Sequence, residues 1–241
     1  MSNKIRMGII GNGGIFKGAH LPFYLKDKRV EVVALCDIRQ DRAEWARNKH
    51  FKNAAVYTDY KDLLRDQSID AVDICTPNYL HSIIAVDAFA AGKHVFCEKP
   101  IALNSKEAEQ FCALEAAHPE VKIGVCLQNR MNETTEELKK IIDSGEYGKI
   151  IGIRGFVPWR RGPEYYSVKP WRGTWKYAGG GSMINQSLHT LDLLYFLGGK
   201  IDKIHAVVGQ TNEYGIEVEG DVVARLEFAG GAPGLFFATN N

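Results

Sequence analysis

Short apolar runs alternate with amphipathic segments through the first half of the chain. The apolar runs have the length of buried strands and lie at residues 5–10, 31–36, 71–75, 95–97 and 121–127. Segments of helical character separate them, at about residues 20–25, 39–49, 60–65, 79–91 and 105–118. This strand–helix alternation predicts an α/β fold with a doubly wound parallel sheet.

The pattern changes after residue 128. An amphipathic helix at residues 133–144 ends at Gly145, and β-like runs follow at 150–157, 203–210, 218–228 and 232–239. Residues 159–181 form an irregular stretch rich in tryptophan, tyrosine, arginine and glycine. A chain of 241 residues is too long for one small core. We therefore predict two domains, residues 1–128 and 129–241.

Composition excludes several classes of partner. The formal net charge is +1, which provides no field for binding nucleic acid or an anionic membrane. No apolar run approaches the roughly 18 residues of a membrane span. The five cysteines show no C-x-x-C pairing, and most lie in apolar runs. These features predict a reduced, cytoplasmic protein without a metal site.

A glycine turn follows the first predicted strand. Gly11-Asn12-Gly13-Gly14-Ile15-Phe16 joins that strand to a helix, and Asp37 ends the second strand. Glycines at such a turn let the backbone approach a pyrophosphate, while the acid binds a ribose. Phe16 occupies the third glycine position of this fingerprint, so we expect a looser helix–strand approach. Arg39 can meet a 2′-phosphate, but Asp37 repels one, which favours NAD over NADP.

Two later strand ends also carry polar residues. Thr76-Pro77-Asn78 ends one strand and precedes His81, which either lies near a cofactor or is a surface histidine. Glu98-Lys99-Pro100 ends the next strand, where ligands of open parallel sheets bind. Lys99 can serve there as a proton donor or electrostatic clamp. The alternative is a solvated Glu–Lys pair.

The second half offers further candidates. Gly179-Gly180-Gly181 leads into a helix in which Asn185 and His189 stand four residues apart and are expected to share one face. His189 is either a catalyst or a hydrogen-bonded core histidine. The aromatic and arginine side chains of residues 159–181 suit sugar rings and anionic groups, or else fill a domain interface.

Together these residues resemble the glucose–fructose oxidoreductase / inositol dehydrogenase family of nicotinamide-dependent sugar dehydrogenases. The resemblance covers essentially the whole chain. It is carried by the glycine turn with His20-Leu21-Pro22, by Cys75-Thr76-Pro77-Asn78 with His81, by Ala91-Gly92-Lys93-His94-Val95 with Glu98-Lys99-Pro100, and by Gly179-Gly180-Gly181 with Asn185 and His189. It implies a Rossmann domain and a second α+β domain built on an open, mainly antiparallel sheet used in homo-oligomer contacts.

The resemblance also implies roles for individual residues. Lys99 lies beside the nicotinamide, and His189 is the acid/base. In many members the position of Asn185 is an aspartate paired with the histidine. The pattern around Asn185 looks closest to the branch acting on nucleotide-linked amino-sugar uronates, with Arg130, Trp171 and Arg172 as substrate residues. The expected cofactor-binding set is Gly11, Gly13, Gly14, Ile15, Phe16, Asp37, Thr76, Pro77, Asn78, His81, Glu98, Lys99 and Pro100.

The leading hypothesis is therefore hydride transfer between NAD and a secondary alcohol of a sugar, inositol or nucleotide sugar. The alternatives are a nicotinamide-binding sensor without turnover and an NAD-dependent glycoside hydrolase. Family members continue past the last predicted strand, so the chain is expected to be a fragment with exposed strand edges. A short homologue with its open edge covered by a partner is the other interpretation.

Overall fold

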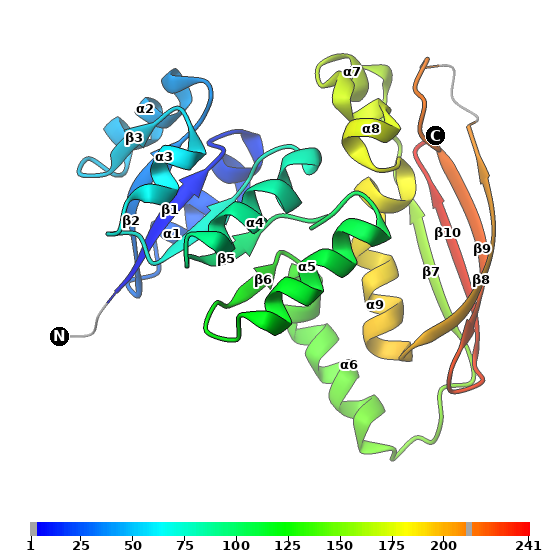
Figure 1. Ribbon diagram of the computed structural model, residues 1–241. Coiled ribbons are helices and arrows are strands. Elements are labelled where there is room, and N and C mark those ends of the chain that lie inside the picture. The colour runs from blue at the N-terminus through cyan, green and yellow to red at the C-terminus, as the bar shows by residue number, and fades with distance from the viewer. Residues whose placement is uncertain (1–3, 211–213) are drawn as a thin grey trace. The chain divides into compact units, whose positions relative to one another are not determined.

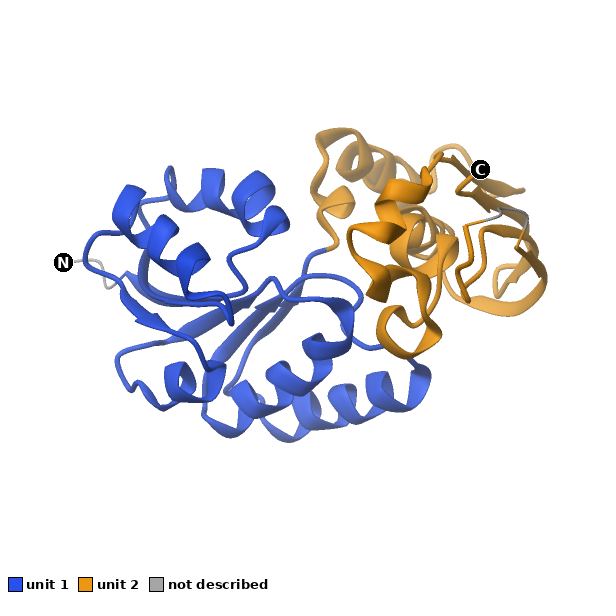
Figure 2. Ribbon diagram, turned by 90° about the horizontal axis from the view of Figure 1, so that it is seen from above, with its two compact units in different colours: residues 1–126 blue, residues 127–241 orange. Residues whose placement is uncertain are grey.

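The computed structural model describes residues 4–210 and 214–241. The chain forms two compact units, Met1–Cys126 and Leu127–Asn241 (Figure 2). Within the described residues, no helix is both long and apolar enough to cross a bilayer.

The first unit is built on a six-stranded sheet in the order β3-β2-β1-β4-β5-β6, and every pairing is parallel. The strands are β1 Ile5–Ile10, β2 Val30–Cys36, β3 Ala55–Tyr57, β4 Ala71–Ile74, β5 His94–Cys97 and β6 Ile123–Val125. The strand order reverses between β1 and β4, which is the topological switch point where ligands of such sheets bind. The predicted doubly wound sheet is confirmed.

Helices cover both faces of this sheet. They are η1 Phe16–His20, α1 Leu21–Tyr24, α2 Gln40–Lys49, α3 Tyr60–Arg65, η2 Asn78–Leu80, α4 His81–Ala90 and α5 Ser105–Ala117. Successive strand residues enter opposite cores: Ile9 packs with Phe16 and Leu21, whereas Ile10 packs with Ile84 and neighbours. Burial on both faces explains why the strands appear as continuous apolar runs rather than alternating ones.

Phe16 is accommodated by a wide turn. Residues Phe16–His20 form a π-helical segment before α1, and the Phe16 side chain is completely buried in the core. The phenylalanine at the third glycine position therefore fills the helix–strand contact. The same segment buries His20, four residues further on.

The second unit contains a four-stranded sheet in the order β7-β10-β9-β8 (Figure 1). Its strands are β7 Ile153–Pro158, β8 Ile201–Gly209, β9 Asp221–Phe228 and β10 Pro233–Thr239. Two pairings are antiparallel and the β10–β7 pairing is parallel, so the sheet is mainly antiparallel, as predicted. Helix α9 Leu188–Gly198 packs on one face, where Leu194 joins the buried side chains of β9 and β10.

The remaining elements of this unit are η3 Gln128–Met131, α6 Glu133–Ser144, α7 Pro163–Ser167, η4 Pro170–Gly173, α8 Trp175–Ala178 and η5 Ser182–Gln186. The stretch predicted to be irregular thus contains three short helices. Two of them begin with proline at the first turn, where its missing N–H is not needed.

Candidate active site

The glycine turn lies at the carboxyl end of β1. Gly11 adopts φ +97°, and a Cβ there would lie 2.8 Å from the carbonyl carbon of Cys75, so only glycine fits. Gly14 has no atom within 4 Å of an added Cβ, and Gly13 would meet only Arg42 Nη1 at 4.0 Å. The turn therefore packs tightly at Gly11 and borders open space at Gly13 and Gly14.

Asp37 follows β2 at the same edge of the sheet and is buried. Its Oδ2 accepts a hydrogen bond from the Asn12 backbone N–H at 2.8 Å, and its Oδ1 accepts one from the Arg39 N–H at 2.9 Å. Each oxygen keeps a second lone pair for a ribose hydroxyl. The Arg39 guanidinium pairs with Asp41 instead.

Unpartnered polar atoms lie on both sides of the switch point. The side-chain amide of Asn12 and the hydroxyl of Thr76 are buried, and neither has a hydrogen-bond partner among the described residues. Buried polar atoms normally bind protein, water or ligand. With the open space beside Gly13 and Gly14 and the placement of Asp37, they fit a dinucleotide lying across the strand ends.

Two buried histidines hold the segment Glu98-Lys99-Pro100 after β5. His20 Nε2 lies 2.9 Å from Glu98 Oε1, and its Nδ1 lies 2.7 Å from Asp73 Oδ2 of β4. His81 Nδ1 lies 2.7 Å from the Pro100 carbonyl oxygen, and its Nε2 lies 2.8 Å from that of Thr76. Lys99, half-buried, therefore stands between two residues that are each tied to the β4 segment.

The first of these histidines belongs to a charged network. Burial lowers the pKa of His20, but hydrogen bonds to Asp73, the Cys126 and Cys75 thiols and Glu98 outweigh this effect and raise it far above the ordinary value. For Glu98 burial acts in the other direction and raises the pKa of the carboxyl group. Hydrogen bonding to His20 outweighs this effect and brings that pKa below its usual range. The ring is thus an imidazolium between two carboxylates. Tyr24 adds a third donor, with its hydroxyl 2.8 Å from Asp73 Oδ2.

The same cluster also gathers potential metal ligands. His20, Asp73 and Cys75 bring three ligand atoms within 4.8 Å of one another. Metal binding requires a deprotonated thiol and a neutral imidazole. Burial raises the pKa of the Cys75 thiol, and both ring nitrogens of His20 already lie at hydrogen-bond distance from the carboxylates of Asp73 and Glu98.

Asn185 and His189 lie in the second unit, on two consecutive helices rather than one. Asn185 belongs to the π-helical η5, His189 to the first turn of α9, and Ser187 separates them with φ −105° and ψ 5°. The expectation of one continuous helix is therefore wrong, and the i,i+4 spacing rule does not apply to this pair. That the two side chains share one face stays a prediction.

The glycine run before η5 has a local cause. Glu219, buried, accepts hydrogen bonds from the backbone N–H groups of Gly181 and Met183 at 2.8 and 3.0 Å. A Cβ on Gly181 would lie 1.9 Å from the Glu219 carbonyl oxygen, so this approach requires glycine. The contact fixes the start of the segment that carries Asn185.

The arginines of the second unit differ in their partners. Arg172 lies with its guanidinium carbon 4.0 Å from the centre of the Tyr165 ring and 5.7 Å from that of Trp171. Arg161 donates to Gln186 Oε1 at 2.7 and 3.0 Å. Within residues 4–210 and 214–241, neither arginine forms an ion pair. Arg130 instead donates to Asp192 of α9 and so joins η3 to that helix.

Sequence reasoning did not identify the charged network. His20 and Asp73 are the residues missed, together with Tyr24. One local signal existed, because Asp73 is an acid within the apolar run 71–75 and is completely buried in β4. An acid in such a strand requires a buried partner.

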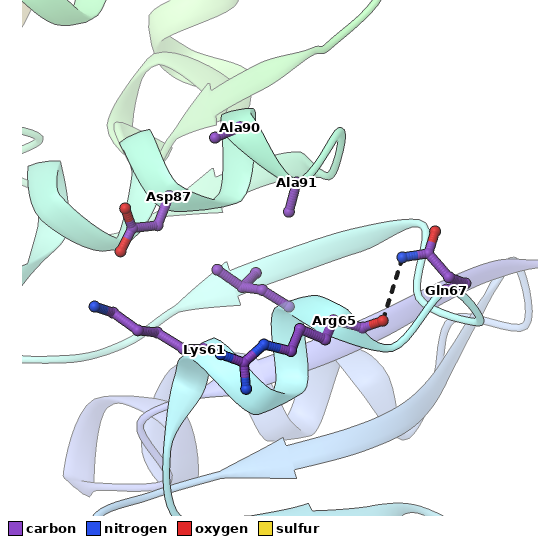
Figure 3. A pocket seen from close by; sticks show the side chains of 7 residues that line it. Lys61, Arg65, Gln67, Asp87, Ala90 and Ala91 are labelled. Atoms are coloured by element: carbon purple, nitrogen blue, oxygen red, sulfur yellow. Dashed lines mark hydrogen bonds between the residues drawn. The ribbon is translucent and has the colours of Figure 1, made fainter.

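A surface depression between α3 and α4 lies elsewhere (Figure 3). It is lined by Lys61, Leu64, Arg65, Gln67, Asp87, Ala90 and Ala91. Apart from Lys61 in the first turn of α3, these residues lie toward the C-terminal ends of both helices, which in a doubly wound fold meet the amino ends of the strands. The depression is therefore at the opposite edge from the glycine turn and shares none of its residues.

The fold and this edge of the sheet together define a dinucleotide-binding Rossmann domain followed by a second α+β unit. A family model described as an oxidoreductase family with an NAD-binding Rossmann fold matches residues 5–125. The model of the GFO/IDH/MocA C-terminal domain matches residues 135–241. The chain belongs to the GFO/IDH/MocA oxidoreductase family, and its first unit is the NAD-binding domain of that family.

Similar proteins are dehydrogenases of sugars and polyols. The chain is 30% identical to levoglucosan dehydrogenase of Pseudarthrobacter phenanthrenivorans, covering 99% of this chain and 68% of that protein. It is 34% identical to inositol 2-dehydrogenase of Salmonella typhimurium over 63% of this chain, which is 45% of that protein. The chain thus spans between about half and two thirds of the length of these relatives.

Solved structures agree with this relationship. The WlbA dehydrogenase from Bordetella pertussis, in complex with NADH and UDP-GlcNAcA, superposes with a TM-score of 0.91 at 32% identity. That match covers 98% of this chain and 71% of the other. Levoglucosan dehydrogenase in complex with NADH and levoglucosan superposes with a TM-score of 0.84 at 28% identity, covering 99% of this chain and 67% of the other.

Proposed function

We propose that the protein transfers a hydride between NAD and a secondary alcohol of a sugar, inositol or nucleotide sugar. The observation that carries the proposal is the anchoring of Glu98-Lys99-Pro100 at the carboxyl edge of the NAD-binding domain. His20 holds the residue before Lys99, and His81 holds the residue after it. Such double anchoring is how a catalytic side chain is kept in a productive position.

Each side chain has a defined task in this reaction. NAD, held by the residues at the strand ends, would supply the hydride acceptor for the alcohol carbon. His189 accepts the hydroxyl proton, and Lys99 donates a hydrogen bond to the oxygen as negative charge develops on it. Asn185 orients the substrate hydroxyl or the imidazole. An amide cannot stabilise an imidazolium as a carboxylate would.

The cofactor residues follow from the predicted set. The backbone at Gly13, Gly14, Ile15 and Phe16 receives the pyrophosphate, and Asp37 receives the adenosine ribose. Thr76, Pro77 and Asn78 line the other half, together with His81 and Glu98. The buried, unpartnered Thr76 hydroxyl supports this arrangement.

The arginine–aromatic stretch favours an anionic sugar as substrate. Arg161 and Arg172 form no ion pair among the described residues. The Arg172 guanidinium lies near the rings of Tyr165 and Trp171. Planar guanidinium groups bind carboxylate and phosphate oxygens in pairs. A nucleotide-linked uronate carries both groups. Because Asp192 already neutralises Arg130, that residue contributes less charge to the substrate.

The decisive test is the Lys99→Ala variant. We expect turnover to fall by roughly 10²–10⁴-fold, because the developing alkoxide loses its donor, while NAD binding stays nearly unchanged. Lys106→Ala, which removes an exposed lysine at the start of α5, is the matched control and should retain full turnover. Wild-type turnover in Lys99→Ala would refute the assignment.

A substrate scan separates the proposed reaction from its rivals. Absorbance of reduced nicotinamide is followed with sugars, inositols and nucleotide sugars. Net reduction of NAD supports a dehydrogenase, sugar release with recycled cofactor indicates a glycoside hydrolase, and binding without change indicates a sensor. The named relatives are dehydrogenases, which favours the first outcome.

A further inference from the structure

Residues 159–178 of the second unit carry an excess of positive charge. They contain five basic residues and one acidic residue, Glu164, although the net charge of the whole chain is only +1. Glu217 and Glu219 precede β9, and their carboxylates accept hydrogen bonds from backbone N–H groups of this region. Even with these two acids, five basic side chains stand against three acidic ones. The region is therefore suited to an anionic ligand.

Arg161 is held by a neutral acceptor rather than by an acid. Its Nε and Nη2 atoms donate to Gln186 Oε1 at 3.0 and 2.7 Å, and its Nη1 donates to the Arg160 carbonyl oxygen at 3.3 Å. Neither acceptor is charged, and Arg161 forms no ion pair within the part of the chain that the structure describes. Nη1 and Nη2 each carry a second N–H. The edge between them can therefore bind a carboxylate through two parallel hydrogen bonds.

Gln186 is buried in η5, and both ends of its amide have partners. The Nε2 atom donates to the Tyr165 hydroxyl at 2.6 Å. Because a guanidinium can only donate, the amide oxygen must face Arg161, and the amide nitrogen then faces Tyr165. The Tyr165 ring also contacts Arg172, whose guanidinium carbon lies 4.0 Å from the ring centre. The glutamine, the tyrosine and the two arginines thus form one connected group.

The neutrality of Gln186 determines what Arg161 can do. A carboxylate at this position would accept the same two hydrogen bonds, but it would also neutralise the guanidinium. The amide orients the guanidinium and leaves its charge for a ligand. Asn185, the preceding residue of η5, is the residue proposed above to orient the substrate hydroxyl. An anion bound by Arg161 is therefore expected to belong to the reacting sugar rather than to a more distant nucleotide.

We infer that Gln186 is a positioning residue that orients Arg161 without neutralising it, and that Arg161 selects sugars bearing a carboxylate over their neutral counterparts. The inference rests on the proposed function, because it takes the substrate to be a sugar bound beside η5. A uronate forms paired, charge-assisted hydrogen bonds with the guanidinium. A neutral sugar displaces water from the same group and provides no charge in return, so selectivity arises from both effects.

The test variant is Gln186→Glu, which changes one nitrogen to oxygen. The new carboxylate accepts both hydrogen bonds from Arg161, and its second oxygen accepts from the Tyr165 hydroxyl. The connected group is thereby kept, while the charge of Arg161 is neutralised. Dissociation constants are measured by calorimetric titration in the presence of NADH, so that no turnover occurs. The probes are two matched pairs, D-glucuronate with D-glucose and UDP-glucuronate with UDP-glucose.

We expect wild type to bind the acidic member of at least one pair more tightly than the neutral member. Gln186→Glu should reduce this preference about tenfold, as expected when a charge-assisted hydrogen bond is weakened, and should leave the affinity for the neutral member unchanged. In turnover with an acidic sugar, KM should rise while kcat stays near the wild-type value. Gln110→Glu, which adds the same charge at an exposed position of α5, is the matched control and should keep the wild-type preference.

A second variant, Arg161→Gln, removes the charge itself and should reduce the preference at least as much. It tests the inference even where Gln186→Glu fails to fold. Equal affinity of wild type for both members of each pair would overturn the inference. So would an unchanged preference in Gln186→Glu, or an equal loss for acidic and neutral members.

These results are distinguishable from a failure of the proposed function. A protein that reduces NAD with a sugar but shows no preference for the acid remains a dehydrogenase. A protein that reduces NAD with no sugar would overturn the proposed function, whereas the preference measured by binding alone would stand.

Discussion

Two buried histidines at the same edge of the first sheet contact the same two segments of the chain but differ in protonation state. His20 joins Asp73 of β4 to Glu98, and His81 joins the carbonyl oxygen of Thr76 to that of Pro100. Both therefore tie the β4 segment to the segment that carries Lys99. The pKa of His20 is raised, whereas burial lowers the pKa of His81 despite its two carbonyl partners.

The difference shows that partners, not burial, decide the charge of a buried histidine. Burial disfavours the imidazolium in both places. A neighbouring carboxylate stabilises the imidazolium with a full negative charge, whereas a carbonyl group stabilises it only with its dipole. A neutral His81 donates to one carbonyl and leaves the other without its proton. The link through His20 is therefore ionic, whereas a neutral His81 makes one hydrogen bond, to the carbonyl oxygen of either Thr76 or Pro100.

The largest effect is expected from Asp73→Asn, which breaks the ionic link through His20. The variant removes one of the two carboxylates around a buried imidazolium, which should lower the free energy of unfolding by roughly 3 kcal/mol. Urea unfolding followed by circular dichroism measures this change. Asp62→Asn is the matched control, because Asp62 pairs with Arg65 on the surface and should contribute little. An Asp73→Asn protein as stable as wild type would mean that His20 is neutral.

A smaller and pH-dependent effect is expected at the neutral His81. The pKa of folded His81 is below its unfolded value, so below about pH 6.5 the unfolded chain binds the extra proton. Its contribution to stability is present above that pH and is lost as the pH falls, by up to about 1.4 kcal/mol per pH unit. The difference in unfolding free energy between wild type and His81→Gln should therefore shrink from pH 7 to pH 5.

His20 predicts the opposite sign, since its folded pKa is raised. Its contribution to stability is fully present below about pH 6.5 and declines as the pH rises.

His118→Gln, at an exposed histidine, is the control for the His81 series. A His81 difference that grows toward acid pH would contradict the neutral assignment.

The fold could be predicted from the sequence, whereas the contacts of the two buried histidines could not. Strands β1, β2, β4 and β5 appear as apolar runs because both faces of the sheet are buried. Strand β3 was missed because Ala55–Tyr57 is three residues long and only partly buried. The glycine turn and Asp37 were found because their roles follow from local spacing.

The charged network depends on contacts that no local pattern contains. His20 lies 53 residues from Asp73 and 78 residues from Glu98. In the second unit, the spacing argument for Asn185 and His189 assumed one continuous helix, whereas Ser187 separates two helical segments. A residue that acts through distant partners can be recognised from sequence only where its burial would be unfavourable without a partner. Asp73, an acid within the apolar run of β4, is such a residue.

The smallest effect is expected from Tyr24→Phe, and it tests how the ionic link through His20 is ordered. The Tyr24 hydroxyl donates to Asp73 Oδ2, the oxygen that also faces His20 Nδ1. Burial and Asp73 raise the pKa of Tyr24, so the hydroxyl remains a donor. Its removal should lower the free energy of unfolding by about 1–2 kcal/mol, because Asp73 keeps the imidazolium as a partner.

Tyr57→Phe, which loses a hydrogen bond to Asp66 at a less buried site, is the control in the same urea experiment. If Tyr24→Phe destabilised the protein as much as Asp73→Asn, the carboxylate of Asp73 would depend on the phenol rather than on His20, and the link would not be ionic.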